Sequence, residues 1–401
     1  MHHNFLTMSE NGVLLPGALE FVKKVKAEIP KSRIYIAANG ATLNAKGRLA
    51  STGLDRDSLS TGAIRLPHNR ESRNQTLQYH RTQSKKCHLK GLEDQSSMDC
   101  QEAIALFESV STSRVVHIER CATGMANYVF IVFTEKDKFV LRCSKDENAY
   151  QDTVYWLGRL AECDIPIPTV LSEGQYGGYV YLILSYFPGE DLGDVYGELK
   201  DSEKRQIAGE VVRIQRKVSK LEHRPDPAWT WNRFVDEMLD VAETRIQSKH
   251  YFDPDKVRLV RKLQKDLQDY LDQVPQTPYL DDISTKNLLI HGGKVSGIID
   301  IDGIGFGDWL TFAALSQVAL LNMDQDTSYI DYLLDEIRPT PAQRKAFIFY
   351  CLLYCVDFMG ERGMQFLDKT VPVDENVIRR LNGIFDLLME EWRTIASPSP
   401  T

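Results

Sequence analysis

The segment from Leu280 to Asp300 constrains this chain more than any other stretch. It holds Asp282, then Asn287 five positions later, and Asp300 thirteen positions after that, placed around short apolar runs. Hard divalent cations prefer oxygen ligands, and magnesium is usually held by one or two carboxylates together with phosphate oxygens. The alternative is that the three residues only form the turns of a hairpin. Their joint spacing favours a magnesium site.

Composition and charge exclude several classes of protein. The 401 residues suffice for two or three domains, and 43% hydrophobic with 26% charged residues is ordinary for a soluble globular protein. The net charge of −8 argues against a nucleic-acid binder, which normally carries a basic face. No signal peptide or membrane partner is predicted, since the most apolar stretch, Ala346–Met359, is too short to span a bilayer and reads as a buried helix. Seven scattered cysteines without C-x-x-C spacing indicate a reducing cytoplasm.

Residues 99–398 have the pattern of one continuous unit with two parts. The first part, residues 99–187, combines β-branched and aromatic runs with two helical periods. The second part, residues 188–398, is mainly helical, with two short strands around the acidic set. The expected strands are Val115–Ile118, Tyr128–Phe133, Lys138–Cys143, Tyr179–Tyr186, Leu288–Ile290 and Val295–Ile301. The expected helices are Gln101–Val110, Ala149–Glu162, Ser202–Lys220, Trp231–Ser248, Pro254–Gln273, Trp309–Asn322, Thr340–Gly360 and Val373–Ile395.

The first 98 residues differ from the rest of the chain. Gly17–Lys26 predicts an amphipathic helix, and Arg33–Gly40 predicts a strand that ends in a turn. Residues 58–98 lose the apolar period and are rich in polar residues, so they are predicted to form a disordered basic linker. Its excess charge comes from Arg65, Arg70, Arg73, Arg81, Lys85, Lys86 and Lys90.

With the acidic set in place, residues 101–395 resemble the aminoglycoside phosphotransferase and choline kinase superfamily, which has a protein-kinase-like fold. The family's catalytic loop reads His-Gly-Asp-x-x-x-x-Asn-x-Leu, and here Leu280, Asp281, Asp282 and Asn287 occupy that register. The resemblance implies that Asp282 is the catalytic base, and that Asn287 and Asp300 bind Mg²⁺. It also implies an α+β, two-lobed fold with a small antiparallel N-lobe and a helical C-lobe.

Further motifs support the resemblance in the order that the family requires. Gly124-Met-Ala-Asn127 resembles the hairpin that covers the nucleotide phosphates, and Arg142 stands where kinases carry the phosphate-binding lysine. Ser185, Tyr186 and Phe187 precede Pro-Gly-Glu and match the hinge whose main chain pairs with the adenine. The turn at Asp308 resembles the family's Gly-Asp turn, where the aspartate is expected to brace a helix or loop.

The chain departs from the family in three ways. Leu280-Asp281 replaces the His-Gly that braces the loop, and a second carboxylate beside Asp282 should raise the pKa of one of the pair. Arg142 replaces lysine. The predicted N-lobe helix Ala149–Glu162 also shows no clear glutamate at the position expected to pair with this cation, and Glu147 and Asp152 are rough candidates.

The N-terminal region carries a second, shorter resemblance. Leu14–Val22, Ile34–Gly40 and Arg48–Leu54 look like part of a haloacid-dehalogenase-type phosphatase core. Ala38 stands where that family has a hydroxyl, and no Asp-x-Asp nucleophile motif precedes Leu14. Residues 1–57 are therefore predicted to be an inactive fragment that does not fold alone.

The resulting hypothesis is a small-molecule kinase. It would transfer the γ-phosphoryl group of Mg-ATP or Mg-GTP to a hydroxyl, with an aminoglycoside or another amino alcohol or sugar as candidate acceptor. The acidic residues Glu190, Asp191, Asp194 and Glu198 would suit a cationic acceptor, although such residues are often only solvated. Trp229 and Trp231 are either packing residues or part of an aromatic cage. The alternative function is a degenerate kinase-like protein that binds a nucleotide or a partner without catalysis.

Overall fold

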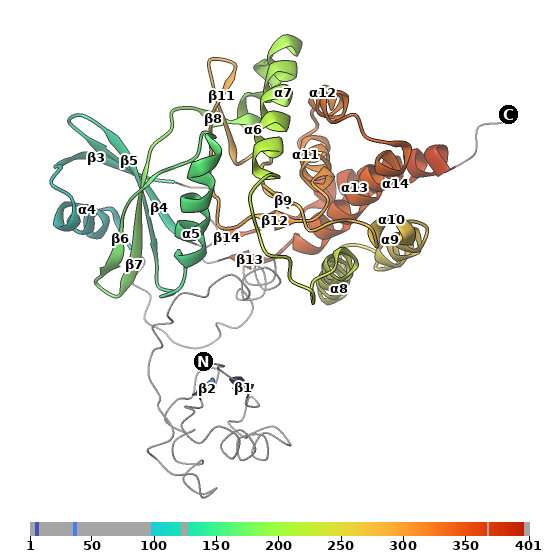
Figure 1. The fold of residues 1–401 in the computed structure, drawn as a ribbon, viewed down its shortest axis with the longest axis horizontal. Helices are drawn as coiled ribbons and strands as arrows, with labels where there is room; N and C mark the ends of the chain where they lie inside the picture. The colour runs from blue at the N-terminus through green and yellow to red at the C-terminus, as the bar shows by residue number, and fades with distance from the viewer. Residues whose placement is uncertain (1–4, 8–34, 38–97, 122–126, 367–368, 397–401) are drawn as a thin grey trace, which may run out of the picture. The chain divides into compact units, whose positions relative to one another are not determined.

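The computed structural model describes residues 5–7, 35–37, 98–121, 127–366 and 369–396 (Figure 1). The chain divides into two compact units, residues 1–70 and 71–401. In the first unit, β1 (Phe5–Thr7) pairs in parallel with β2 (Tyr35–Ala37). This confirms a strand within the predicted range 33–40, while the predicted helix Gly17–Lys26 and the rest of the phosphatase-like motifs lie outside the described residues.

An antiparallel five-stranded sheet forms the N-lobe of the second unit. The strand order is β3-β4-β5-β7-β6. Strands that follow each other in the chain therefore pair, except β5 and β6, which are separated by α5 in the chain and by β7 in the sheet. The predicted strands are confirmed to within two residues at each end, but the structure adds β6, which the sequence analysis missed because this edge strand is largely polar and exposed. The strands are β3 (Val115–Arg120), β4 (Tyr128–Thr134), β5 (Lys138–Ser144), β6 (Val170–Tyr176) and β7 (Tyr179–Ser185).

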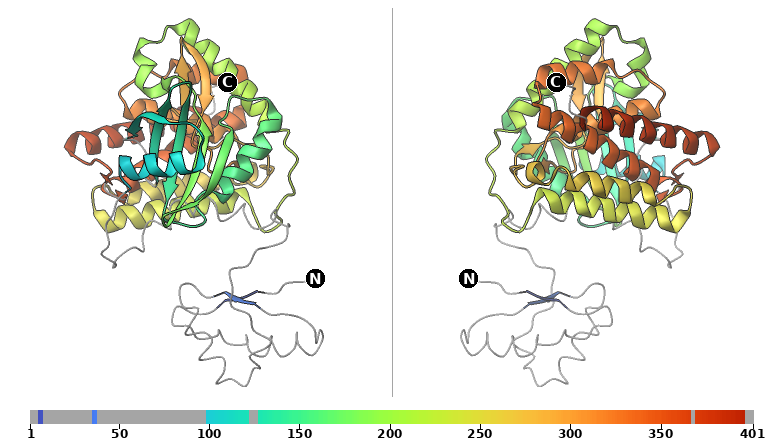
Figure 2. Two further views of the ribbon diagram at one scale, coloured as in Figure 1. Left: turned by 90° about the vertical axis from the view of Figure 1, so that its left-hand side faces the viewer. Right: turned by 90° about the vertical axis from the view of Figure 1, so that its right-hand side faces the viewer.

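Two helices cover opposite faces of this sheet, as Figure 2 shows for α4 (Cys100–Val110) in its left view. Alternation along β7 explains the two layers, because successive strand residues face opposite sides. Ile183 belongs to the cluster that contains the α4 residue Phe107, whereas Leu182 belongs to the main core with α5 (Gln151–Leu160). The N-terminus of α4 is fixed by a capping box in which Asp99 accepts from the Glu102 N–H at 2.8 Å.

The C-lobe is built around α13 (Pro341–Glu361), which confirms the predicted buried helix. Nearly every residue from 346 to 360 is buried, because α8, α9, α11 and α14 pack around it. The helices of this lobe are α6 (Leu192–Val195), α7 (Asp201–Val218), α8 (Trp231–Lys249), α9 (Asp255–Lys265), α10 (Gln268–Leu271), α11 (Leu310–Asn322), α12 (Ser328–Ile337), α13 and α14 (Glu375–Ala396).

One predicted helix needs correction, and one helix was missed. The predicted helix 254–273 is split into α9 and α10, because the chain tightens at Leu267, whose N–H donates to the Gln264 carbonyl at 3.0 Å. Leu267 is thereby buried. The ten-residue α12 was not predicted.

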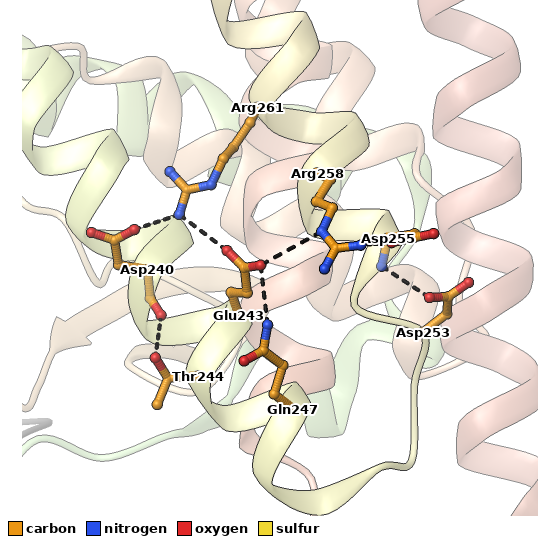
Figure 3. A network of polar contacts seen from close by, with 8 residues as sticks. All are labelled: Asp240, Glu243, Thr244, Gln247, Asp253, Asp255, Arg258 and Arg261. Carbon is orange, nitrogen blue, oxygen red and sulfur yellow. Dashed lines mark hydrogen bonds and ion pairs between the residues drawn. The ribbon is translucent and has the colours of Figure 1, made fainter.

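A charged network joins α8 to α9 on the surface of this lobe (Figure 3). Arg261 on α9 contacts the carboxylates of Asp240 and Glu243 on α8, and Gln247 donates to Glu243 at 3.2 Å. The Asp240 side chain is 71% exposed, so solvent screens the pair and its contribution to stability is small.

Short strands carry the acidic set between the lobes. β10 (Leu288–His291) forms a hairpin with β11 (Lys294–Ile298), and β8 (Glu190–Asp191) pairs with the other edge of β10. A second short pair joins β9 (Pro278–Tyr279) to β12 (Gly305–Phe306), and β13 (Gln365–Phe366) pairs with β14 (Lys369–Thr370).

Candidate active site

The loop before β10 is organised around Asp282 and Asn287. The Asn287 side chain is 9% exposed, and its Nδ2 donates to the Asp282 main-chain carbonyl at 2.9 Å. Ser284 Oγ donates to Asp282 Oδ1 at 3.2 Å. The amide nitrogen of Asn287 thus ties the loop together, and its Oδ1 is the atom that can serve as a ligand for a hard cation.

The pKa of Asp282 is raised to about 7. The main cause is desolvation by the surrounding protein, followed by repulsion from Asp281 and Asp300. Solvent nevertheless reaches the side chain, which is exposed. A carboxylate that is accessible and has a pKa near neutrality is suited to accept a proton from a hydroxyl.

The departure at Leu280-Asp281 is compensated by a residue that the sequence analysis missed. The fully buried Gln215 of α7 accepts from the Leu280 N–H at 2.9 Å and donates to the Leu280 carbonyl at 2.7 Å. This pair of hydrogen bonds braces the loop where the family carries histidine. Asp281 is half-buried, and desolvation raises its pKa to about 6. The expected effect of the second carboxylate is seen at Asp282, whose pKa Asp281 raises.

Asp300 lies in the turn after β11 and not on the strand, which corrects the predicted strand 295–301. The strand ends at Ile298, and the Ile299 N–H donates to the Asn287 carbonyl at 3.0 Å. Asp300 itself has a left-handed backbone with φ of 60°, which ends the extended conformation. The hydrogen bond from Ile299 places the two predicted metal ligands on adjoining segments.

The oxygen donors at this position fit a magnesium ion. Asn287 offers an amide oxygen, and the Asp300 carboxylate is 54% exposed and so open to a ligand. Within the described ranges, no cluster of three or more His, Cys, Asp or Glu residues could hold a metal. Mg²⁺ takes few protein ligands and completes its shell with water and phosphate oxygens, so the Asn287 and Asp300 oxygens are of the kind that could hold it.

Arg142 on β5 reaches the same turn from the N-lobe. Its Nη1 and Nη2 donate to Asp302 at 2.9 and 3.0 Å, and Nη2 lies 3.2 Å from Asp300 Oδ1. Burial disfavours the cation, but the two carboxylates outweigh it and hold the pKa of Arg142 above its usual value. The sequence analysis had considered only Glu147 and Asp152 as partners.

The family of this chain follows from a match to a protein-family model. The model of the phosphotransferase enzyme family matches residues 117–347, more than half of the 401-residue chain. The chain belongs to this family. A search of curated proteins gives no significant match.

Solved structures show the same fold as this phosphotransferase family member. A thermostable mutant of aminoglycoside phosphotransferase APH(4)-Ia, in complex with ADP and hygromycin B, aligns with a TM-score of 0.54 at 16% identity, over 74% of this chain and 98% of that chain. Its complex with AMP-PNP and hygromycin B aligns with a TM-score of 0.53 at 18% identity, over 73% and 98%. ADP-bound APH(2'')-Ib aligns with a TM-score of 0.50 at 12% identity, over 74% and 99%. The predicted two-lobed, kinase-like α+β fold is confirmed.

The predicted nucleotide-binding residues of this phosphotransferase are only partly described. Gly124 lies outside the described residues, and Asn127 lies just before β4. The Ser185 N–H donates to the Thr169 carbonyl at 3.0 Å, so pairing of Ser185 with a base would use its carbonyl. Tyr186 and Phe187 follow β7, and the Phe187 ring packs so closely on β11 that a Cβ at Gly297 would lie 2.7 Å from it. The hinge is therefore anchored directly on the hairpin of the acidic set.

The acidic residues after the hinge lie beside the catalytic loop. β8, which contains Asp191, pairs with β10, and the Gly193 N–H donates to the Thr285 carbonyl at 2.8 Å. Desolvation, then repulsion from Asp194, raises the pKa of Asp191 to about 6, although Lys286 lowers it. This concentration of negative charge lies on the segment that contacts the loop at Thr285, three residues after Asp282.

Trp229 and Trp231 are packing residues. Their side chains are 8% and 2% exposed, and the Trp231 Nε1 donates to the Tyr350 hydroxyl at 2.9 Å. They line a cavity of about 690 Å³ between the segments 219–232 and 268–278, and none of the acidic set contributes to its walls. We therefore place the site at the acidic set.

In the part of the chain that the structure describes, each helix is too short or too polar to cross a membrane.

Proposed function

We propose that this family member transfers the γ-phosphoryl group of ATP or GTP to a hydroxyl of a small molecule. The observation that carries the proposal is a pair of hydrogen bonds around Asn287, one from its Nδ2 to the Asp282 carbonyl and one from the Ile299 N–H to the Asn287 carbonyl. The second bond holds the residue that directly precedes Asp300. They bring a base of raised pKa together with two oxygen ligands for a cation. The related structures that contain ADP or AMP-PNP support a nucleotide donor.

In the proposed mechanism, Asp282 accepts the proton of the acceptor hydroxyl as that oxygen forms a bond to the γ-phosphorus. The bond from the γ-phosphorus to the bridging oxygen breaks, and the nucleoside diphosphate leaves. Asn287 and Asp300 would hold Mg²⁺, which when bound neutralises the charge on the phosphate oxygens. Arg142 adds a fixed positive charge beside them, and the segment at Gly124 and Asn127 would cover the phosphates. Ser185, Tyr186 and Phe187 would receive the base.

We infer that the acceptor carries a positive charge. The carboxylates of Asp191 and Asp194 adjoin the catalytic loop, and a site of one charge sign concentrates ligands of the other sign. Aminoglycosides and other amino alcohols or amino sugars meet this requirement, and two of the related structures contain hygromycin B.

One observation favours the second candidate, a protein that binds nucleotide without transferring phosphate. Arg142 is engaged by both Asp302 and Asp300, and Asp300 is also the proposed metal ligand. An enzyme must share the Asp300 carboxylate between Arg142 and the metal, whereas a non-catalytic protein could keep it for Arg142 alone.

The test is phosphate transfer from labelled ATP or GTP with Mg²⁺ to a panel of aminoglycosides, amino alcohols and neutral sugars. The Asp282→Asn variant removes the base, and Asp335→Asn makes the same chemical change on the exposed surface of α12. Transfer that Asp335→Asn retains and Asp282→Asn loses supports the enzyme. Nucleotide binding without transfer to any acceptor favours the second candidate, and absence of both refutes the proposed function.

A further inference from the structure

The cation at position 142 is anchored by a carboxylate outside the N-lobe. Asp302 forms a two-pronged ion pair with Arg142, at 2.9 and 3.0 Å, and also accepts from Thr153 Oγ1 at 2.8 Å. Thr153 belongs to α5, the helix that lacks a clear glutamate for this cation. The side chains of Arg142 and Thr153 are almost fully buried, whereas Asp302 is 35% exposed.

This arrangement fixes the plane of the guanidinium. Two parallel hydrogen bonds from one arginine to one carboxylate define an orientation as well as a distance. The Thr153 hydroxyl on α5 donates to the same carboxylate as Arg142. Residues from β5, α5 and the turn after β11 therefore meet at Asp302. The Arg142 guanidinium also lies 5.3 Å from the centre of the Tyr150 ring, which limits its movement on another side.

We propose that Asp302 is the positioning residue that holds Arg142 for the nucleotide phosphates, with Thr153 as its support on α5. The inference rests on the proposed function, because it assigns a role within the same nucleotide site. Asp302 thus supplies from the C-lobe turn the carboxylate that α5 does not provide.

The second carboxylate also resolves the competition for Asp300. The Asp302 N–H donates to the Asp300 carbonyl at 3.1 Å, so both aspartates belong to one tight turn. If Asp300 were to hold a metal ion, Asp302 would still compensate the buried charge of Arg142. Without Asp302, Arg142 and the metal would compete for the single carboxylate of Asp300, since an unpaired buried charge is strongly unfavourable.

The primary test is the affinity of Asp302→Asn for ATP, measured by titration calorimetry both with Mg²⁺ and with EDTA. Loss of a residue that orients a binding group typically weakens affinity 10- to 100-fold, and we expect a loss of about this size in both conditions. Asp240→Asn is the matched control, because it also removes a carboxylate from an arginine ion pair between two elements, in the network of Figure 3. It should bind ATP as the unmodified protein does.

Two further variants separate positioning from a general effect on folding. Asp302→Glu keeps the charge and should restore part of the affinity. Thr153→Glu in the Asp302→Asn background places a carboxylate on α5 itself and should recover binding, which a merely structural defect would not allow. Thermal unfolding of each variant shows whether the fold is retained.

The outcomes distinguish this inference from the proposed function. If the unmodified protein neither binds ATP nor transfers phosphate, the proposed function fails. If it does both and Asp302→Asn binds ATP equally well or more tightly, the positioning role is overturned. Tighter binding would show that Asp302 withholds Arg142 from the phosphates.

Discussion

Replacement of Asp308 by alanine should destabilise the C-lobe strongly, since this buried carboxylate accepts three hydrogen bonds. The Tyr270 and Tyr350 hydroxyls donate to Oδ2 at 2.5 and 3.0 Å, and the Leu310 N–H donates to Oδ1 at 3.1 Å. Asp308 therefore joins α10, α11 and α13, which agrees with its predicted role as a brace.

The size of the effect follows from the burial of each donor. Tyr350 and Leu310 are 0% exposed, so water cannot replace Asp308 there, whereas Tyr270 is only half-buried and can bind water. Each buried donor left without an acceptor costs about 1–3 kcal/mol, which gives a total of about 2–6 kcal/mol for the two. Burial of the Asp308 carboxylate is itself unfavourable, as the rise of its pKa through desolvation shows. The alanine variant no longer has this desolvation cost, which offsets part of the lost stability. We expect a net loss of about 3 kcal/mol.

The assay is urea unfolding of the full chain followed by tryptophan fluorescence. Asp308→Asn keeps an acceptor for Leu310 and should cost about half as much as the alanine variant. Tyr350→Phe, alone and combined with Asp308→Ala, gives the coupling between the two side chains, for which we expect about 1–3 kcal/mol. If Asp308→Ala lies within about 0.5 kcal/mol of the unmodified protein, the brace contributes nothing and the reasoning is wrong.

Three further predictions concern the catalytic residues and the turn before α11. Asp300→Ala should lower the transfer rate by on the order of 10²–10³ without unfolding the exposed turn, and near-full activity at any Mg²⁺ concentration would refute the metal assignment. Because Asp282 acts as a base only when deprotonated and its pKa is raised to about 7, kcat/KM should fall as the pH drops below about 7; a profile flat down to pH 5 would exclude it as the base. Gly307→Ala should cost about 3 kcal/mol or more, since φ is 148° and a Cβ would lie 2.1 Å from the Trp231 ring. Urea unfolding measures this loss, and Gly383→Ala on α14, where a Cβ meets open space, should be neutral or stabilising in the same assay.

The elements of the N-lobe and the long helices were predictable from the sequence because their signals are local. Richness in Val, Ile and Phe together with turn residues marked β4 and β5, and nearly unbroken apolar composition marked α13. β6 escaped prediction because it lies at the edge of the sheet, where solvent permits polar residues. The end of β11 also escaped prediction, because Ile299 and Ile301 continue the apolar strand pattern in sequence, whereas the Ile299 N–H donates to the Asn287 carbonyl outside the strand pairing.

The sequence by itself determined the proposed chemistry of the site. Asp282 and Asn287 share one loop and Asp300 follows within the same hairpin, so their spacing along the chain almost dictates their proximity in space. The hinge residues, Arg142 and Asp308 were predicted from the motifs that resemble the family, and the roles of the hinge and Arg142 in binding a nucleotide stay predictions.

The supports of the site were decided only by the tertiary structure. Gln215 braces Leu280 from 65 residues away, and Asp302 reaches Arg142 and Thr153 across 160 and 149 residues. In our proposal, each takes the place of a family residue that this chain lacks and comes from a different element of the fold. Ion pairs and hydrogen bonds depend on distance and direction in space, and many combinations of distant residues can satisfy the same buried donor or charge. A single sequence therefore shows that a histidine and a glutamate are missing, and only the fold shows what has taken their place.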